Sequence, residues 1–238
     1  MKNSLLIVLK HTFPRLLGMG LNVYLILLFL KLWRSPQHSD VELIADLTIM
    51  IFFEFIMLWA GFFVSIAAEK SNIVKWFCIL LFIPLVLGFN AVITGNKILF
   101  IYGMVVLFRI LTSIFEKKSS LSDNSHTKEL SFSNIILYDK LAMPLITFAL
   151  YAFLLTATVS TEYGDYSIPE FGLTEEFLKN SGYYHHMKME VEVPHLYLCL
   201  GVLYFSALIL LDCLVIGLSY REEKRKKQCE IQEHLPNL

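Results

Sequence analysis

Long apolar stretches separated by short polar segments run along most of the chain. About 20 predominantly apolar residues are needed for a helix to cross about 30 Å of hydrocarbon. Lipid cannot satisfy bare backbone groups, so apolar stretches of this length must form helices. The pattern predicts an all-α integral membrane protein with a bundle of about six transmembrane helices. The expected spans are Leu16–Trp33, Leu43–Ile66, Trp76–Ile93, Ile98–Phe115, Leu141–Val159 and Leu196–Leu218.

The third and fourth predicted spans lie close together in the sequence. Only residues 94–97 separate them, and Pro84 and Gly88 interrupt the third. Two geometries fit: a tight hairpin of two full spans, or a shallower re-entrant pair. We favour the hairpin.

The distribution of lysine and arginine predicts the orientation of the spans. With a cytoplasmic N-terminus, fourteen of the 20 basic residues fall in inner segments and five in outer segments, while Arg109 lies within the fourth span. Cytoplasmic segments carry the excess of basic residues in membrane proteins. We therefore expect both termini in the cytoplasm, with the protein in a cell or inner membrane. Residues 1–238 then form a single polytopic domain that ends in a basic cytoplasmic tail, residues 219–238.

The longest outer segment, residues 160–194, is predicted to fold into a small acidic cap. It holds seven acidic residues and two lysines. Thr174 is placed to cap a short helix that stops at Gly182. The alternation in Met187–Val193 is typical of a β-strand with one apolar face, and such a strand needs a partner.

Composition and charge exclude several classes of function. Hydrophobic residues make up 56% of the chain and charged residues only 17%, with a net charge of −1. No basic field favours nucleic acid. Glycine-rich phosphate loops, zinc-protease helices and serine nucleophile elbows are absent from the sequence. We expect no cofactor. The expected partners are the bilayer and either other membrane subunits or further copies of the chain.

Four charged residues fall inside predicted spans: Asp46, Glu54, Arg109 and Asp212. Charges in lipid are costly and usually have a structural or functional role. In the predicted threading Arg109 and Asp212 lie at similar depth. They are expected to face each other, either as an ion pair between two helices or as a gate or proton relay, and the structural role is favoured.

Glu54 lies near the middle of the second predicted span, where burial favours the neutral acid. It is expected to bond to a neighbour such as Asn22, Asn90 or a threonine hydroxyl, or else to serve as a proton or cation site. Asp46 lies nearer the outer end and is expected to meet headgroups or the cap.

Histidines and acids gather just before the last span. His185, His186 and His195, together with Glu190 and Glu192, carry ligand types that suit zinc. Their spacing matches no closed metal motif, so an ordinary polar loop is the favoured interpretation. At the other end of the span, Lys224, Arg225, Lys226 and Lys227 are expected to anchor the helix and attract anionic lipid.

Three functions remain open from the sequence. The preferred one is a non-catalytic subunit or accessory component of a membrane complex. The second is a small transporter or channel that uses Glu54, with Arg109 and Asp212 as a gate. The third is a membrane enzyme that uses the outer histidines and glutamates, and catalysis is the less favoured reading.

Overall fold

A computed structural model describes residues 2–70, 142–164, 167–186 and 193–234. Within these residues the chain is all-helical and contains no β-strand. The predicted third and fourth spans, and most of the predicted strand Met187–Val193, lie outside the described residues. The elements are α1 (Lys2–Arg34), a 3-10 turn (His38–Asp40), α2 (Val41–Lys70), α6 (Ala142–Glu162), α7 (Glu175–Asn180), α8 (Tyr183–His186) and α9 (Pro194–His234).

Three of these helices contain segments long and apolar enough to cross a membrane. The segments are Arg15–Arg34 of α1, the whole of α6, and Pro194–Arg221 of α9. At 1.5 Å per residue, a helix of 20 residues is about 30 Å long, which matches the hydrocarbon core. They correspond to the first, fifth and sixth predicted spans. The second predicted span lies within the single helix α2.

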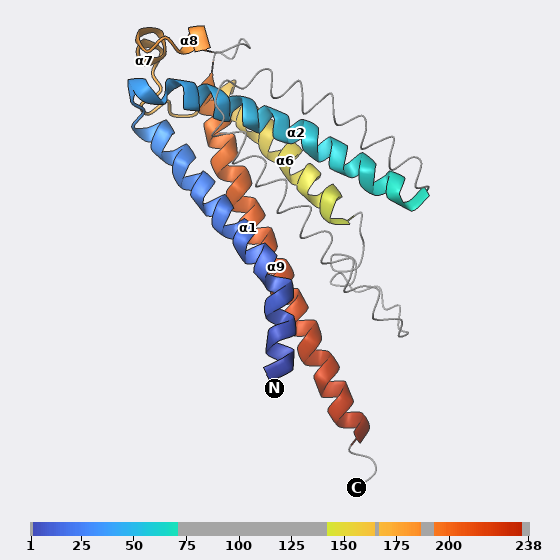
Figure 1. Cartoon of the computed structure of the whole chain (residues 1–238). Helices are drawn as coiled ribbons and strands as arrows, with labels where there is room; N and C mark the ends of the chain where they lie inside the picture. The colour runs from blue at the N-terminus through green and yellow to red at the C-terminus, as the bar shows by residue number, and fades with distance from the viewer. Residues whose placement is uncertain (1, 71–141, 165–166, 187–192, 235–238) are drawn as a thin grey trace.

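The first and last helices form an antiparallel pair (Figure 1). Near the middle of both helices Arg15 contacts Asp212, while nearer the cap the Phe29 ring lies 5.9 Å from the Phe205 ring. A Cβ atom on Gly201 would come within 2.8 Å of the Phe29 ring, so glycine permits the close approach of the two helices. Both chain termini therefore lie at the same end of this pair.

Helices α2 and α6 pack against each other and against α9. Aromatic side chains fill the contact: the Tyr151 and Tyr204 rings lie 5.1 Å apart, Phe55 and Tyr151 5.7 Å, and Trp59 and Phe148 4.7 Å. Edge-to-face and tilted ring pairs at these separations are favourable beyond the area that they bury. Such specific packing matters between membrane helices, because lipid is as apolar as the side chains and drives little association by itself.

A small cap of loop and short helices covers the end where α1 ends and α9 begins (Figure 1). The Thr174 hydroxyl accepts a hydrogen bond from the Phe177 backbone N–H and so caps α7, which is the short helix predicted from the sequence. Gly182 has a φ of +77°, a conformation that glycine adopts without steric strain. The buried residues of the cap are Ile168, Leu173, Leu178 and Tyr183.

Helices α1 and α9 both extend past their apolar segments. The residues from Lys2 to Arg15 belong to the continuous helix α1. The basic tail after residue 219 continues as α9 up to His234. In both cases the helical hydrogen-bond pattern simply extends past the apolar segment, because the flanking residues are ordinary helix formers such as Lys, Glu and Leu.

Candidate functional site

The clearest buried polar contact joins α2 to α9. Glu54 is 3% exposed, and its Oε1 atom accepts a hydrogen bond of 2.8 Å from the Tyr204 hydroxyl, which is itself buried. Tyr204 is not one of the partners expected from the sequence, of which Asn90 lies outside the described residues. A tyrosine hydroxyl is a suitable donor because its ring packs in the apolar core while its tip bonds the carboxyl group.

A second hydroxyl ties α6 to the same region. The Tyr151 hydroxyl donates to the backbone carbonyl of Ile51 over 2.6 Å, and the Tyr151 ring packs edge-on against Tyr204. Glu54, Tyr151 and Tyr204 thus form one polar cluster within the aromatic contact of α2, α6 and α9. We call these three residues the Glu54 cluster.

Asp212 lies in an ion pair with Arg15 of α1, with 3.3 Å between the Arg15 Nη1 and Asp212 Oδ1 atoms. The two side chains are 13% and 25% exposed, so water screens this contact less than it would a surface pair. Arg109 lies outside the described residues, so its expected pairing with Asp212 stays a prediction. Arg15 directly precedes the first predicted span, Leu16–Trp33.

Asp46 is also buried, at 3% exposure, which excludes a position among exposed headgroups. Thr48, two residues further along α2, is buried as well, and its hydroxyl donates to the Ile44 carbonyl. The position of Asp46 in the second turn of α2, beneath the cap, explains the burial, because α8 packs on α2 there.

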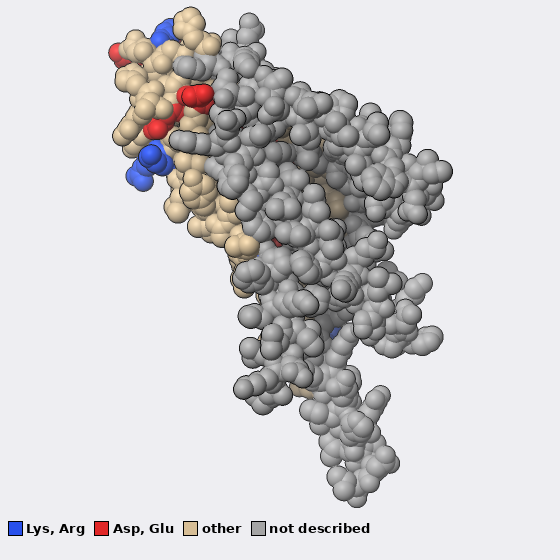
Figure 2. All heavy atoms as spheres, in the orientation of Figure 1, with Lys and Arg blue, Asp and Glu red and all other residues tan. Residues whose placement is uncertain are grey.

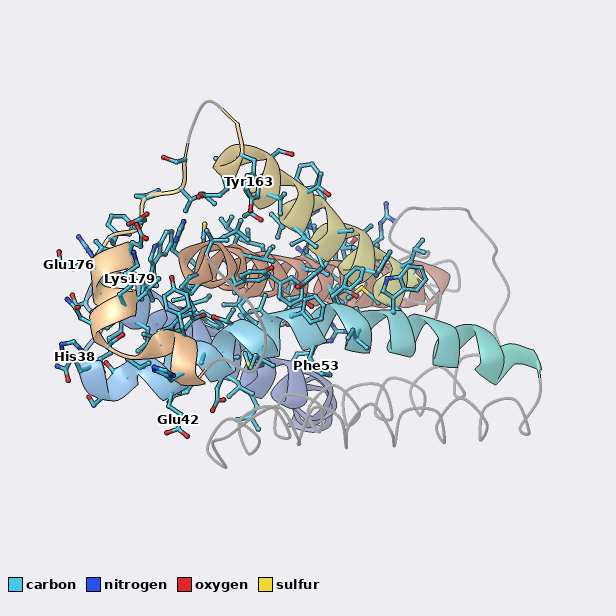
Figure 3. The ribbon with its side chains drawn as sticks, turned by 90° about the horizontal axis from the view of Figure 1, so that it is seen from above. His38, Glu42, Phe53, Tyr163, Glu176 and Lys179 are labelled. Atoms are coloured by element: carbon cyan, nitrogen blue, oxygen red, sulfur yellow. The ribbon has the colours of Figure 1, made fainter. Side chains whose placement is uncertain are left out.

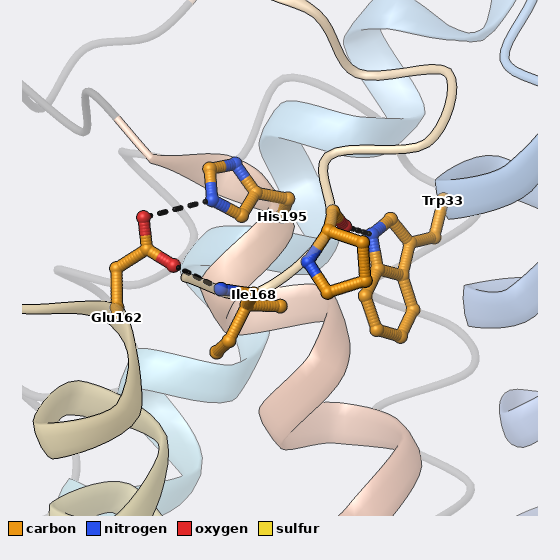
Figure 4. Close-up of polar contacts among 5 residues, drawn as sticks. Trp33, Glu162, Ile168 and His195 are labelled. Carbon is orange, nitrogen blue, oxygen red and sulfur yellow. Dashed lines mark hydrogen bonds and ion pairs between the residues drawn. The ribbon is translucent and has the colours of Figure 1, made fainter. Parts of the chain in front are cut away.

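The cap is tied to the helices by a carboxylate at the end of α6. Glu162 Oε1 lies 3.2 Å from His195 Nε2, and Glu162 Oε2 accepts the Ile168 backbone N–H over 2.9 Å (Figure 4). The His195 and Glu162 side chains are 6% and 14% exposed. A negative charge is unfavourable at the C-terminus of α6 but favourable beside the N-terminus of α9, where His195 is the second residue. We call the contacts of Glu162 with His195 and Ile168 the Glu162 latch.

A second tie joins the cap to α1. The Trp33 indole N–H donates to the Pro169 carbonyl over 2.9 Å (Figure 4), and the Gly172 N–H donates to the Trp33 carbonyl over 3.1 Å. A Cβ atom on Gly172 would meet the Pro36 ring at 2.2 Å, so glycine is required at this approach. Between these contacts Phe171 adopts a φ of +47°, which costs about 1–2 kcal/mol for a residue with a side chain.

The outer histidines do not form a common site within the described part of the chain. His185 is exposed on α8, while His195 is buried against Glu162 on α9. No group of three or more potential metal ligands occurs among the described residues. His186 belongs to α8, and Glu190 and Glu192 lie outside the described residues.

Three ionisable groups of the cap have altered pKa values. Burial raises the pKa of the Tyr183 hydroxyl well above its usual value, an effect that the nearby Thr48 side chain opposes. That hydroxyl is shielded from solvent and has no hydrogen bond of good geometry among the described residues. On the exposed face of α7, Glu175 and Lys179 form an ion pair one helical turn apart, which lowers the pKa of Glu175 and raises that of Lys179.

The basic residues after the last span lie on the C-terminal extension of α9. Lys224 and Arg225 are exposed there, and Lys226 and Lys227 belong to the same continuous helix. The exposed positions fit the predicted contact with lipid headgroups, which stays a prediction.

Sequence reasoning placed the buried acids but not their partners. Tyr204, Arg15 and Glu162 were not singled out. The available signal for Tyr204 was a tyrosine in the middle of an apolar span, where a buried hydroxyl needs a partner. For Glu162 it was an acid at the end of a span opposite a histidine at the start of the next.

Comparison with known proteins gives no family for this chain. No family model matches it, and no curated protein or solved structure is significantly similar to it.

Proposed function

We propose that the chain is a multi-pass membrane protein that acts as a non-catalytic structural component of a membrane assembly. In this proposal it crosses a cell or inner membrane six times, with both termini in the cytoplasm and the cap on the opposite side. The excess of basic residues in the segments assigned to the inside supports this orientation. The antiparallel packing of α1 and α9 supports termini on the same side.

The structural role is supported by the contacts that polar side chains of the long helices make, because each contact joins one helix to another. Asp212 joins α9 to α1 through Arg15, and Glu54 joins α2 to α9 through Tyr204. At the outer end, Glu162 joins α6 to α9 through His195. All three contacts converge on α9, so this helix acts as the common support of the bundle. Polar contacts of this kind lock helices together in lipid.

The second candidate is a small transporter or channel, and the burial of Glu54 favours it. A carboxyl group held within the helix bundle by a hydroxyl donor can bind and release a proton or cation. Arg109 and Asp212 would form the gate in this candidate, and the acidic cap would concentrate cations at the entrance.

One experiment separates the two candidates. The chain is isolated from its native membrane in lipid nanodiscs, without detergent. The structural proposal expects it to elute with other membrane polypeptides in a fixed ratio. Elution as a single species containing this polypeptide alone contradicts that proposal.

The same preparation is then reconstituted in liposomes under a pH gradient and, separately, under a cation gradient. Wild type, Glu54→Gln and the control Glu42→Gln, an exposed position on the same helix, are compared. The structural proposal expects equal ion leakage for all three. A flux that is lost in Glu54→Gln and kept in Glu42→Gln would replace it with the transporter.

A further inference from the structure

The turn at residues 169–172 presents an aromatic side chain outward. Phe171 is 55% exposed, and its ring packs edge-on against Trp33 at 5.1 Å. The Leu173 N–H donates to the Glu170 carbonyl across the turn, which holds Phe171 in the left-handed conformation. The fold thus maintains a backbone conformation unfavourable for phenylalanine while its ring remains half exposed.

The height of this turn along the helices is fixed by its contacts with α1. Trp33, which contacts both Pro169 and Phe171, is the last residue but one of the apolar segment Arg15–Arg34. Phe171 therefore lies level with the end of a segment able to cross a membrane. In a bilayer crossed by this segment, that height is the boundary between headgroups and acyl chains.

Tyr163 is a second exposed aromatic residue, and it lies at the end of the apolar helix α6. Tyr163 directly follows α6, whose apolar segment ends at Glu162, and it is 77% exposed. Figure 3, seen from above the cap, places Tyr163 at the end of α6, apart from Glu176 and Lys179 on α7. Amphipathic aromatic residues are enriched where membrane helices reach the interface.

Exposed charged side chains of the cap lie on α7, and one more, Glu170, directly precedes Phe171 in the turn. On the face shown in Figure 2, charged side chains of the described residues gather over the cap. Glu175 and Lys179 on α7 have side chains that are 74% and 64% exposed. The cap therefore combines a water-facing helix with aromatic residues at the height of the membrane surface.

From this arrangement we propose that the cap is anchored in the membrane interface by Phe171 and Tyr163. The occupant of this surface is lipid, at the headgroup–acyl boundary of the leaflet where α1 ends and α9 begins. The anchor holds the turn and, through Trp33, the outer end of α1 at a fixed depth. The proposal rests on the assignment of α1 and α6 as spans and not on either proposed function.

The test places a fluorescent label at single positions of the full chain in liposomes. Phe171→Cys and, as control, Lys179→Cys are made in a background with the four native cysteines changed to serine, and labelled with an environment-sensitive dye. The dye at position 171 is expected to emit at shorter wavelength, to be quenched severalfold more by lipids spin-labelled near the headgroup than the dye at 179, and to resist aqueous iodide. Equal iodide quenching at both positions overturns the proposal.

Native membranes supply the second arm of the test. Shielding of position 171 from both iodide and spin-labelled lipid there would mean that a protein partner covers it, and this also overturns the proposal. If the cysteine-free background fails to fold, Trp33 serves as the probe in the Trp59→Phe, Trp76→Phe variant. Quenching of Trp33 by the shallow spin label supports the anchor, and its absence contradicts it.

Discussion

Tyr183 in the cap combines tight packing of its ring with poor hydrogen bonding of its hydroxyl. Its ring is fully buried beneath the cap, while its hydroxyl makes no well-formed hydrogen bond among the described residues. A buried polar group left in this state loses its bonds to water without full replacement. Thr48 on α2 lies close enough to influence the hydroxyl, but its own hydrogen is donated to Ile44.

Removal of this hydroxyl is expected to stabilise the protein. We predict that Tyr183→Phe raises the free energy of unfolding by about 1 kcal/mol, because the ring packing is kept and a poorly satisfied polar group is lost. The control Tyr184→Phe, at an exposed neighbouring position, is expected to change it by less than about 0.5 kcal/mol. Thermal unfolding in detergent measures both. A loss of stability in Tyr183→Phe alone would show that the hydroxyl has a good partner.

The same residue gives a pH dependence of known sign. Because burial raises the pKa of Tyr183 in the folded state, the unfolded chain loses this proton first, at the ordinary tyrosine pKa of about 10. Folding stability is therefore kept below pH about 10 and falls as the pH rises above it. The fall is expected to be shallower in Tyr183→Phe than in Tyr184→Phe.

For single residues, the sequence predicted the burial of an acid such as Glu54 better than it predicted the residue that the acid contacts. Glu54 was predicted to be buried because apolar residues flank it on both sides for several turns. Its partner Tyr204 lies 150 residues away. Periodicity along one helix does not say which residue of another helix stands at the same height, so that contact required the structure.

The helices were easier to predict from the sequence than the contacts between them, because the apolar pattern of each helix lies in one continuous stretch of the chain. The apolar segments of α1, α6 and α9 were predicted to within a few residues, and Thr174 marked the start of α7. What the sequence did not predict was how far α1 and α9 continue past their apolar segments. Polar residues there favour a helix by propensity but carry no burial signal that marks its end.

The Glu162 latch is the contact through which α6, α9 and the cap support one another. Glu162→Ala leaves the Ile168 N–H and the His195 ring without their buried acceptor, so we expect a loss of about 1–3 kcal/mol in the free energy of unfolding. Hydrogen exchange is expected to accelerate at Ile168 and through the cap, residues 168–186, more than in the helices. Glu170→Ala, exposed on the same loop, should leave exchange unchanged. Uniform acceleration over the whole chain would mean that the latch supports the bundle and not the cap.

The described part of the molecule is organised around the long pair of α1 and α9, and the proposed sidedness of the chain follows from this pairing. Arg15 meets Asp212 farther from the cap, and Phe29 meets Phe205 nearer to it, so the two helices run in opposite directions. If both cross the bilayer, the residues before Arg15 and the residues after Arg221 emerge on one side, and the cap lies on the other. The arrangement of charge agrees, since the exposed Lys224 and Arg225 follow α9 while α7 begins with Glu175 and Glu176.

Single cysteines report this sidedness directly. In the cysteine-free background, Lys179→Cys on α7 is expected to react with a membrane-impermeant maleimide in intact cells, because the proposed orientation puts the cap outside. Gln228→Cys, exposed on the extension of α9, is expected to react only after the membrane is opened. Asn3→Cys near the start of α1 should follow Gln228→Cys, since the structure places both ends of the pair together. Labelling of Asn3→Cys and Gln228→Cys under opposite conditions would mean that α1 and α9 do not both cross the membrane as an antiparallel pair.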